Sequence, residues 1–227
     1  MQKFEYKLIK ARRRTICLSI RDGQLIVRAP FLTPAWYINR FLDSKSDWIE
    51  KHLRKTQVLF KRQYKEGEKF LFLGRELELK IIMTNLKKPE IETNSLNLTI
   101  LTYDDSKKFL RLQIERFYKD RTREIVLKLI KKYEPDFSGS ACLPARQVTI
   151  KPYKSKWGSC TGKNDLSFNS KLAMTPMEVI EYVVIHELCH IKQKNHSKNF
   201  WQLVGSIDGE YNKRRKWLRR LHDKLVL

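Results

Sequence analysis

The chain has 227 residues, of which 41% are hydrophobic and 11% aromatic, which is typical of a globular protein with a real core rather than a disordered one. Its 47 lysines and arginines against 25 acidic residues give a formal net charge of +22, which indicates either a polyanionic partner such as nucleic acid or simply a solvated basic surface. Because no long apolar run, secretory signal or CxxC pair is visible, the sequence argues against a membrane span or a disulfide framework, and we expect a cytoplasmic protein with reduced thiols.

The first part of the chain, residues 1–100, predicts a small α+β unit in which no residue carries recognisable chemistry. A helix is expected from Pro34 to about Lys55, with Thr33 as its N-cap and proline in its first position. Turns are expected at Asp22-Gly23 and Gly74-Arg75. Six short strands are expected, at 4–9, 15–20, 24–29, 70–73, 76–83 and 96–101.

The second part, residues 101–227, predicts a helical domain with a small mixed sheet. A long amphipathic helix is expected from about Ser106 to Tyr133, ended by Pro135 and a loop from Gly139 to Pro144. The C-terminal segment NKRRKWLRRLHDKL is basic and helical. Two strands are expected on either side of the segment KSKWGSC, at 147–150 and 166–168. The fold class is therefore expected to be α+β, with a domain boundary near residue 100.

The segment MTPMEV, residues 174–179, has the composition of a helix start. Thr175 is expected as the N-cap, with Pro176 in the first helical position and Glu178 completing a capping box. From Val179 to Ile191 the sequence is apolar on nearly every side, which indicates a buried helix. Titratable groups inside such a helix cost roughly several kcal/mol unless they have partners.

Three such groups, His186, Glu187 and His190, form an HExxH pattern within this helix. The two histidines are four residues apart, so both imidazoles project from one face and can reach one metal ion. Glu187 lies at the flank of the same site, where it is suited to take a proton from metal-bound water. The pattern is roughly a half-per-cent event by chance in a chain with five histidines.

A third histidine, His196, follows six residues after His190. Asn195 is expected to adopt a left-handed turn that ends the helix, and Ser197 to cap a further helix from Lys198 to Gly205. This turn would return His196 to the same metal. Three imidazole nitrogens with one open position are the pattern of a catalytic zinc site rather than a closed structural one. The alternative is a set of core histidines satisfied without a metal.

These residues carry a resemblance to a known family. The segment YVVIHELCHIKQKNHSKNFW, with the upstream KWGSC and the downstream YNKRRKWL, resembles the YgjP-like metallopeptidases, relatives of the WLM and SprT-like proteases within the zincin superfamily. The resemblance extends from about Gln147 onward. It implies a zincin-like metallopeptidase with one Zn²⁺ per chain, His186, His190 and His196 as ligands, and Glu187 as catalytic general base. Metzincins share the spacing but have glycine where this chain has Gln193.

Analogy with zincins also suggests how a substrate would bind. An extended peptide would add to an edge formed by the strands around Gln147–Lys151 and Asp165–Asn169. Glu187 would deliver its proton to the leaving nitrogen, while Tyr211 either donates to the oxyanion or only packs. Gly158 is expected to supply a turn near the cleft.

The sequence is compatible with two functions. The first is a cytoplasmic zinc peptidase acting on a protein or peptide substrate, and the second is a basic nucleic-acid-binding module with a structural or vestigial metal site. Glu187 favours the enzyme, because a structural site has no use for a carboxylate beside its first histidine. The related SprT-like and WLM proteases act on proteins attached to DNA, so a basic surface is compatible with both. Salt-sensitive nucleic-acid binding is expected through Lys213, Arg214, Arg215, Lys216, Arg219 and Arg220.

Overall fold

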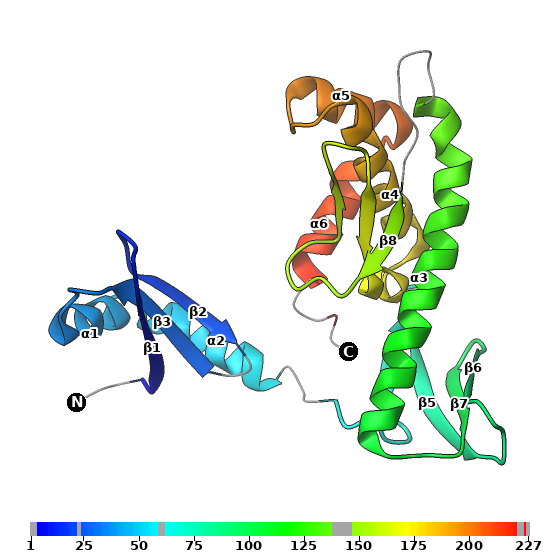
Figure 1. Ribbon diagram of the computed structural model, residues 1–227, viewed down its shortest axis with the longest axis horizontal. Coiled ribbons are helices and arrows are strands. Elements are labelled where there is room, and N and C mark those ends of the chain that lie inside the picture. Colours follow the sequence, from blue (N-terminus) through cyan, green and yellow to red (C-terminus); the bar gives the residue numbers. More distant parts are fainter. Residues whose placement is uncertain (1–3, 22–23, 59–61, 138–146, 222–224, 226–227) are drawn as a thin grey trace. The chain divides into compact units, whose positions relative to one another are not determined.

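The computed structural model describes residues 4–21, 24–58, 62–137, 147–221 and 225, and the chain divides into two compact units, Met1–Lys61 and Arg62–Leu227 (Figure 1). Helices and small mixed sheets make up both units, so the expected α+β class is confirmed. No helix in the described ranges is long and apolar enough to cross a membrane. The turn expected at Asp22-Gly23 lies outside the described residues.

The first unit is a three-stranded sheet followed by two helices. Its strands have the order β1-β3-β2, in which β3 pairs parallel with β1 and antiparallel with β2. A core of apolar residues from β3 and both helices, including Val27, Ile38 and Ile49, holds the unit together. The elements are β1 (Tyr6–Ala11), β2 (Cys17–Arg21), β3 (Gln24–Pro30), α1 (Ala35–Asp43) and α2 (Ser46–Val58).

The single helix expected from Pro34 to Lys55 is wrong, because the chain breaks between α1 and α2. The hydroxyl of Ser44 donates to the carbonyl of Phe41 at 2.7 Å, a local bond that competes with continuation of the helix. The start also differs: Pro34 itself is the N-cap, with extended backbone (φ −72°, ψ 152°), and no side chain caps the helix.

The second unit begins with a four-stranded sheet of order β4-β5-β7-β6. Leu73 and Gly74 form the two-residue turn between β4 and β5, and both have positive φ (48° and 80°), as a type I′ hairpin requires. The turn therefore lies one residue earlier than expected, since Arg75 already belongs to β5. The strands are β4 (Lys69–Phe72), β5 (Arg75–Met83), β6 (Glu90–Thr93) and β7 (Asn97–Thr102).

The long helix α3 (Lys107–Phe137) runs the length of the second unit (Figure 1). It contributes residues to two cores of this unit. Its first half, including Leu110 and Tyr118, packs with β4, β5 and β7, and its second half, including Val126 and Ile130, packs with α4 and β10. The boundary expected near residue 100 lies inside this unit, because the strands before it share a core with α3. The helix also continues through Pro135, beyond the end expected at Tyr133; Gly139 to Pro144 lie outside the described residues.

The rest of the second unit is a three-stranded sheet of order β8-β10-β9 together with the remaining helices. The two expected strands are confirmed to within a residue or two, and a third, β9, lies in the KWGSC segment. Strand β10 is the central strand, parallel to β8 and antiparallel to β9. The elements are β8 (Val148–Lys151), β9 (Gly158–Cys160), β10 (Leu166–Asn169), the 3₁₀ turn η1 (Ser170–Met174), α4 (Met177–Lys192), α5 (Lys198–Ile207) and α6 (Tyr211–Leu221).

Candidate metal centre

The helix α4 begins differently from the expected capping box. The hydroxyl of Thr175 donates to the carbonyl of Leu172 at 2.8 Å and so closes the preceding 3₁₀ turn instead of capping α4. Pro176, with extended backbone (φ −54°, ψ 151°), is the N-cap, and α4 starts at Met177 without a side-chain cap. The close contact of Pro176 with the β4–β5 turn fixes this start, since a Cβ on Gly74 would lie 2.7 Å from the proline ring.

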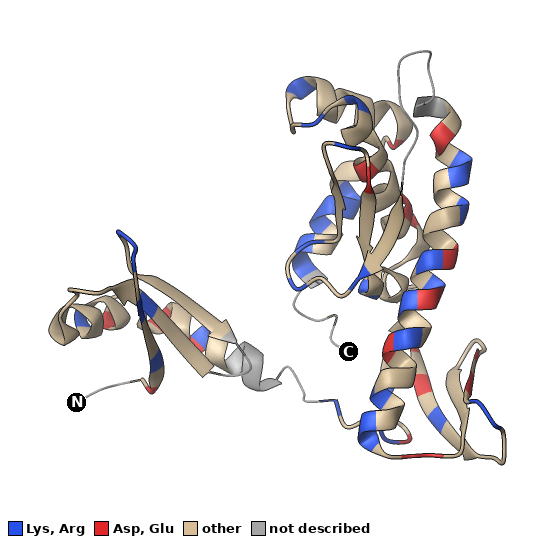
Figure 2. Ribbon diagram, in the orientation of Figure 1, with Lys and Arg blue, Asp and Glu red and all other residues tan. Residues whose placement is uncertain are grey.

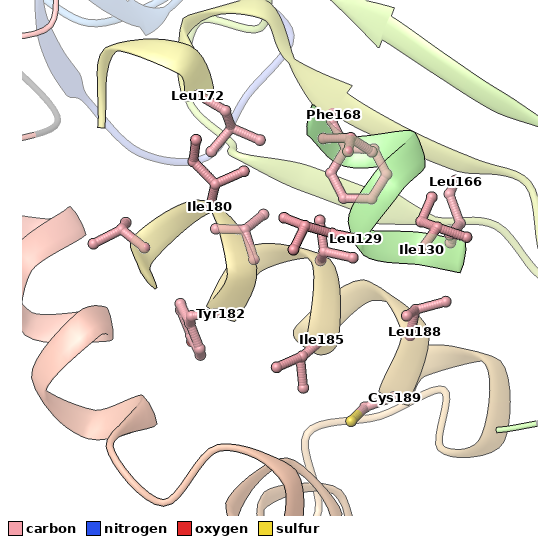
Figure 3. Packing of buried hydrophobic residues seen from close by; sticks show 14 of the residues in the cluster. Leu129, Ile130, Leu166, Phe168, Leu172, Ile180, Tyr182, Ile185, Leu188 and Cys189 are labelled. Atoms are coloured by element: carbon pink, nitrogen blue, oxygen red, sulfur yellow. The ribbon is translucent and has the colours of Figure 1, made fainter. Parts of the chain in front are cut away.

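The rotation of α4 about its axis is set by the core on its apolar side. Side chains of α4 such as Ile180 and Leu188 lie among residues of α3, β10 and η1 (Figure 3). Ile180, Ile185 and Leu188 are almost fully buried. Packing of this face against the sheet and α3 leaves His186 and His190 facing α5, where their rings contact Phe200.

The three expected ligands come together in the structure. The Nε2 atom of His196 lies 3.1 Å from Nε2 of His190 and 3.1 Å from Nε2 of His186, and the ligand atoms of all three lie within 4.8 Å of one another. Nitrogens bound tetrahedrally to one ion at about 2.0–2.1 Å lie about 3.3 Å apart. Three imidazole nitrogens aimed at one point therefore fit a metal ion.

The return of His196 does not use the expected left-handed turn at Asn195. The non-glycine residues with positive φ in the described ranges are Tyr64, Leu73 and Asn164. The chain turns instead through Gln193, which has an extended backbone (φ −127°, ψ 99°) at the end of α4. The expected cap at Ser197 is confirmed, since its hydroxyl accepts the backbone N–H of Phe200 at 3.4 Å.

Hydrogen bonds around this loop hold His190 and the segment with His196 in place. Nδ1 of His190 lies 2.9 Å from the carbonyl of Gln193, which orients the ring and leaves Nε2 for a metal. The ammonium of Lys194 donates to Oδ1 of Asn164 at 2.6 Å and to the carbonyl of Thr161 at 3.1 Å. Lys194 thus ties the loop that carries His196 to the hairpin after β9.

Two aromatic residues of α5 enclose the imidazoles. The ring of His190 stacks on Phe200 with centroids 4.4 Å apart, and that of His196 stacks on Trp201 at 5.6 Å. Burial, together with the neighbouring His190 and His196, lowers the pKa of His186 to about 3, and burial also lowers the pKa of His190. These two imidazoles are therefore neutral at pH 7, which is the form that binds metals.

Glu187 lies in a space that exists because residue 158 has no side chain. A Cβ on Gly158 would lie 2.5 Å from Oε1 of Glu187, 2.6 Å from its Cγ and 2.8 Å from its Cδ. The expectation that Gly158 supplies a turn is wrong, because it is the first residue of β9 and pairs with Phe168. The Glu187 side chain is buried, and this burial raises its pKa to about 8, while the nearby Lys156 acts in the opposite direction.

A pocket of about 490 Å³ opens beside these residues. His186, Glu187 and Gly158 line it together with Tyr182 and with two residues of α6, Arg215 and Arg219. Sequence reasoning missed Tyr182 as a pocket residue, although it lies one turn before His186 on the same helix. The two arginines had no such signal, because their position depends on how α6 packs against α4. Tyr211 is not among the lining residues; its ring stacks on Trp201 with centroids 5.5 Å apart, which favours the packing role.

The sheet edge expected to bind an extended substrate is partly wrong. Strand β10 cannot be an edge, because β8 and β9 pair with it on its two sides. Within the described sheet the edge strands are β8 and β9, and β9 lies against α4. Gly158 of β9 also lines the pocket, so β9 is the edge next to the candidate site.

Basic residues of α6 are partly occupied by other contacts. Lys213 pairs with Glu210, Arg214 pairs with the buried Asp208, and the guanidinium of Arg215 lies 4.3 Å from the ring centroid of Trp201. Figure 2 shows basic residues along α6, whereas basic and acidic residues alternate along α3. Nucleic-acid binding through the six basic residues of this helix stays a prediction.

Comparison with known proteins supports the reading of the sequence. A family model described as "YgjP-like, metallopeptidase domain" matches residues 14–221, which includes most of the first unit as well as the second. The resemblance seen in the sequence is therefore confirmed, and it covers far more than the C-terminal half. No curated protein and no solved structure matches the chain.

Proposed function

The chain belongs to the YgjP-like metallopeptidase family, and we propose that it is a zinc-dependent peptidase with His186, His190 and His196 as ligands and Glu187 as general base. The convergence of three Nε2 atoms beside one buried carboxylate, at the wall of an open pocket, is the observation that carries this proposal. A structural site would need neither the carboxylate nor the pocket.

The donor set favours zinc. Imidazole nitrogens are preferred ligands of zinc, and three protein ligands leave one coordination position for water or substrate. When bound in such a site, zinc supplies a hydroxide at neutral pH and polarises the carbonyl of the scissile bond. The stacking of His190 on Phe200 and of His196 on Trp201 holds these rings for that purpose.

Glu187 moves the proton. Burial alone keeps its carboxyl protonated up to about pH 8, since its pKa is raised to about 8, and a cation held by the adjacent histidines favours the carboxylate form. As a carboxylate, Glu187 accepts a proton from the attacking water and then donates it to the leaving nitrogen. The space left by Gly158 gives the carboxylate its position at the pocket.

We expect the substrate to bind along β9. An extended peptide adds to an exposed strand by backbone hydrogen bonds, and β9 is an edge strand whose first residue, Gly158, lines the pocket. A peptide on this edge would pass directly beside Glu187 and His186.

The test is the substitution Glu187→Gln, which keeps the shape of the side chain but removes the base. We expect the variant to bind zinc as the wild type does and to lose roughly 10²–10⁴-fold in turnover of an unfolded protein substrate. Glu178→Gln is the matched control, because Glu178 is an exposed residue of the same helix. Equal turnover in the Glu187 and Glu178 variants would remove Glu187 from the mechanism.

A further inference from the structure

Two arginines of α6 line the pocket beside the candidate metal centre. Arg215 and Arg219 are four residues apart, so their side chains project from one face of the helix. Leu218, between them in sequence, is buried in the main core and fixes α6 against α4. Both guanidinium groups are thus carried by a packed helix rather than by a loop.

Arg215 is held at a defined place relative to the histidines. Its guanidinium lies 4.3 Å from the ring centroid of Trp201, and the same ring stacks on His196 at 5.6 Å. A guanidinium held on an aromatic ring keeps its N–H donors available at its edge. The contact therefore positions Arg215 close to the candidate centre without using its donors.

Among the residues that the structure describes, the charge of the two arginines is not balanced within the pocket. The two acidic residues just before α6, Asp208 and Glu210, pair with Arg214 and Lys213 instead. Among the described residues that line the pocket, Glu187 has the one carboxyl group, and its side chain is already packed against Gly158 at the candidate site. An anionic ligand would supply the missing charge.

We propose that Arg215 and Arg219 form a subsite that binds a carboxylate of the peptide substrate, which makes the peptidase selective for a negative charge close to the scissile bond. Guanidinium groups bind carboxylates through paired N–H donors, and the partly apolar pocket, with Trp157 and Leu218, strengthens such a bond. The carboxylate is either the C-terminus of the substrate or an aspartate or glutamate side chain. This inference rests on the proposed peptidase function.

Equilibrium binding tests the subsite without turnover. Fluorescent peptides would be titrated into zinc-loaded Glu187→Gln protein and followed by anisotropy. Three peptides of otherwise identical sequence are needed: one with a free C-terminal carboxylate and no acidic side chain, one amidated with a single glutamate, and one amidated with glutamine in its place. We expect one of the first two to bind at least about tenfold more tightly than the neutral peptide, and which one it is identifies the source of the carboxylate.

Arginine variants complete the test. Arg215→Gln and Arg219→Gln, each in the same background, are expected to reduce the affinity for the preferred peptide to that of the neutral one. Arg220→Gln removes the same charge from α6 at a position that does not line the pocket, and it is expected to leave the preference intact. Because Arg219 is exposed, its variant folds even if the Trp201 contact of Arg215 is needed for stability.

Two results would overturn the subsite. One is equal affinity for the three peptides, including the absence of binding by all three. The other is a preference that Arg220→Gln reduces as much as Arg219→Gln does. Failure of the peptidase itself is seen separately, in the zinc content and in the turnover of an unfolded protein by the Glu187 and Glu178 variants, in which both arginines are intact.

Discussion

Replacing Gly158 with alanine places a methyl group where the Glu187 side chain lies. The added Cβ would be 2.5 Å from Oε1, 2.6 Å from Cγ and 2.8 Å from Cδ of Glu187, whereas carbon atoms in contact prefer about 3.5–4.0 Å. The carboxylate therefore has to withdraw by about 1 Å. A displacement of this size in a catalytic group costs about 10²-fold in rate. We expect Gly158→Ala to lower kcat by about this factor.

The assay is the turnover of an unfolded protein substrate, with the zinc content measured on the same samples. Gly158→Ala is expected to keep its zinc, because the three atoms nearest to the new methyl group all belong to Glu187 and none belongs to a histidine. Gly162→Ala is the matched control, since a Cβ at Gly162, in the same hairpin, meets nothing within 4 Å. Wild-type turnover in a folded, zinc-loaded Gly158→Ala protein would refute the argument that the missing side chain positions Glu187.

Two further predictions concern the protein without its metal and the loop that carries His196. Acid destabilises the metal-free protein, because the unfolded chain protonates His186 near pH 6.5 whereas burial lowers its folded-state pKa to about 3; the free energy of unfolding should fall by up to about 1.4 kcal/mol per pH unit between these values. Thermal unfolding of the metal-free protein at pH 7 and pH 5 measures this change. A His186→Phe variant that loses as much stability between the two pH values as the wild type does would contradict the prediction. Lys194→Ala should weaken zinc binding about tenfold, because it frees the His196 loop from Asn164 and Thr161. Competition with a chelator measures this affinity, with Lys198→Ala, an exposed change at the start of α5, as the control; equal affinities would speak against a role for the Lys194 bonds.

The parts of the site that depend on local geometry could be predicted from the sequence. Four-residue spacing on a helix brings His186 and His190 to one face whatever the rest of the fold is. The cap at Ser197 was also predictable, because serine favours that position for a local reason. The turn between His190 and Ser197 was predicted at the wrong residue. Asparagine tolerates left-handed backbone but does not require it, and the chain turns at Gln193 with extended backbone instead.

The features that the sequence did not indicate depend on contacts between distant segments. The space that Gly158 leaves for Glu187 exists only because β9 packs on α4, and a glycine alone signals a turn as readily as a close approach. The place of Arg215 at the pocket depends likewise on the packing of α6. The misplaced boundary near residue 100 has the same origin, because Leu98 and Ile100 share a core with the helix that follows them.

The proposed function depends on three histidines of this chain holding one zinc ion. Elemental analysis of protein purified without a metal-affinity tag, in the wild type and in His196→Ala, tests it most directly, because His196 is exposed and its loss disturbs the core least. We expect about one zinc per wild-type chain and a loss of that zinc in the variant. A wild-type protein that is folded, contains no metal and takes up none when zinc is added would rule out this zinc site.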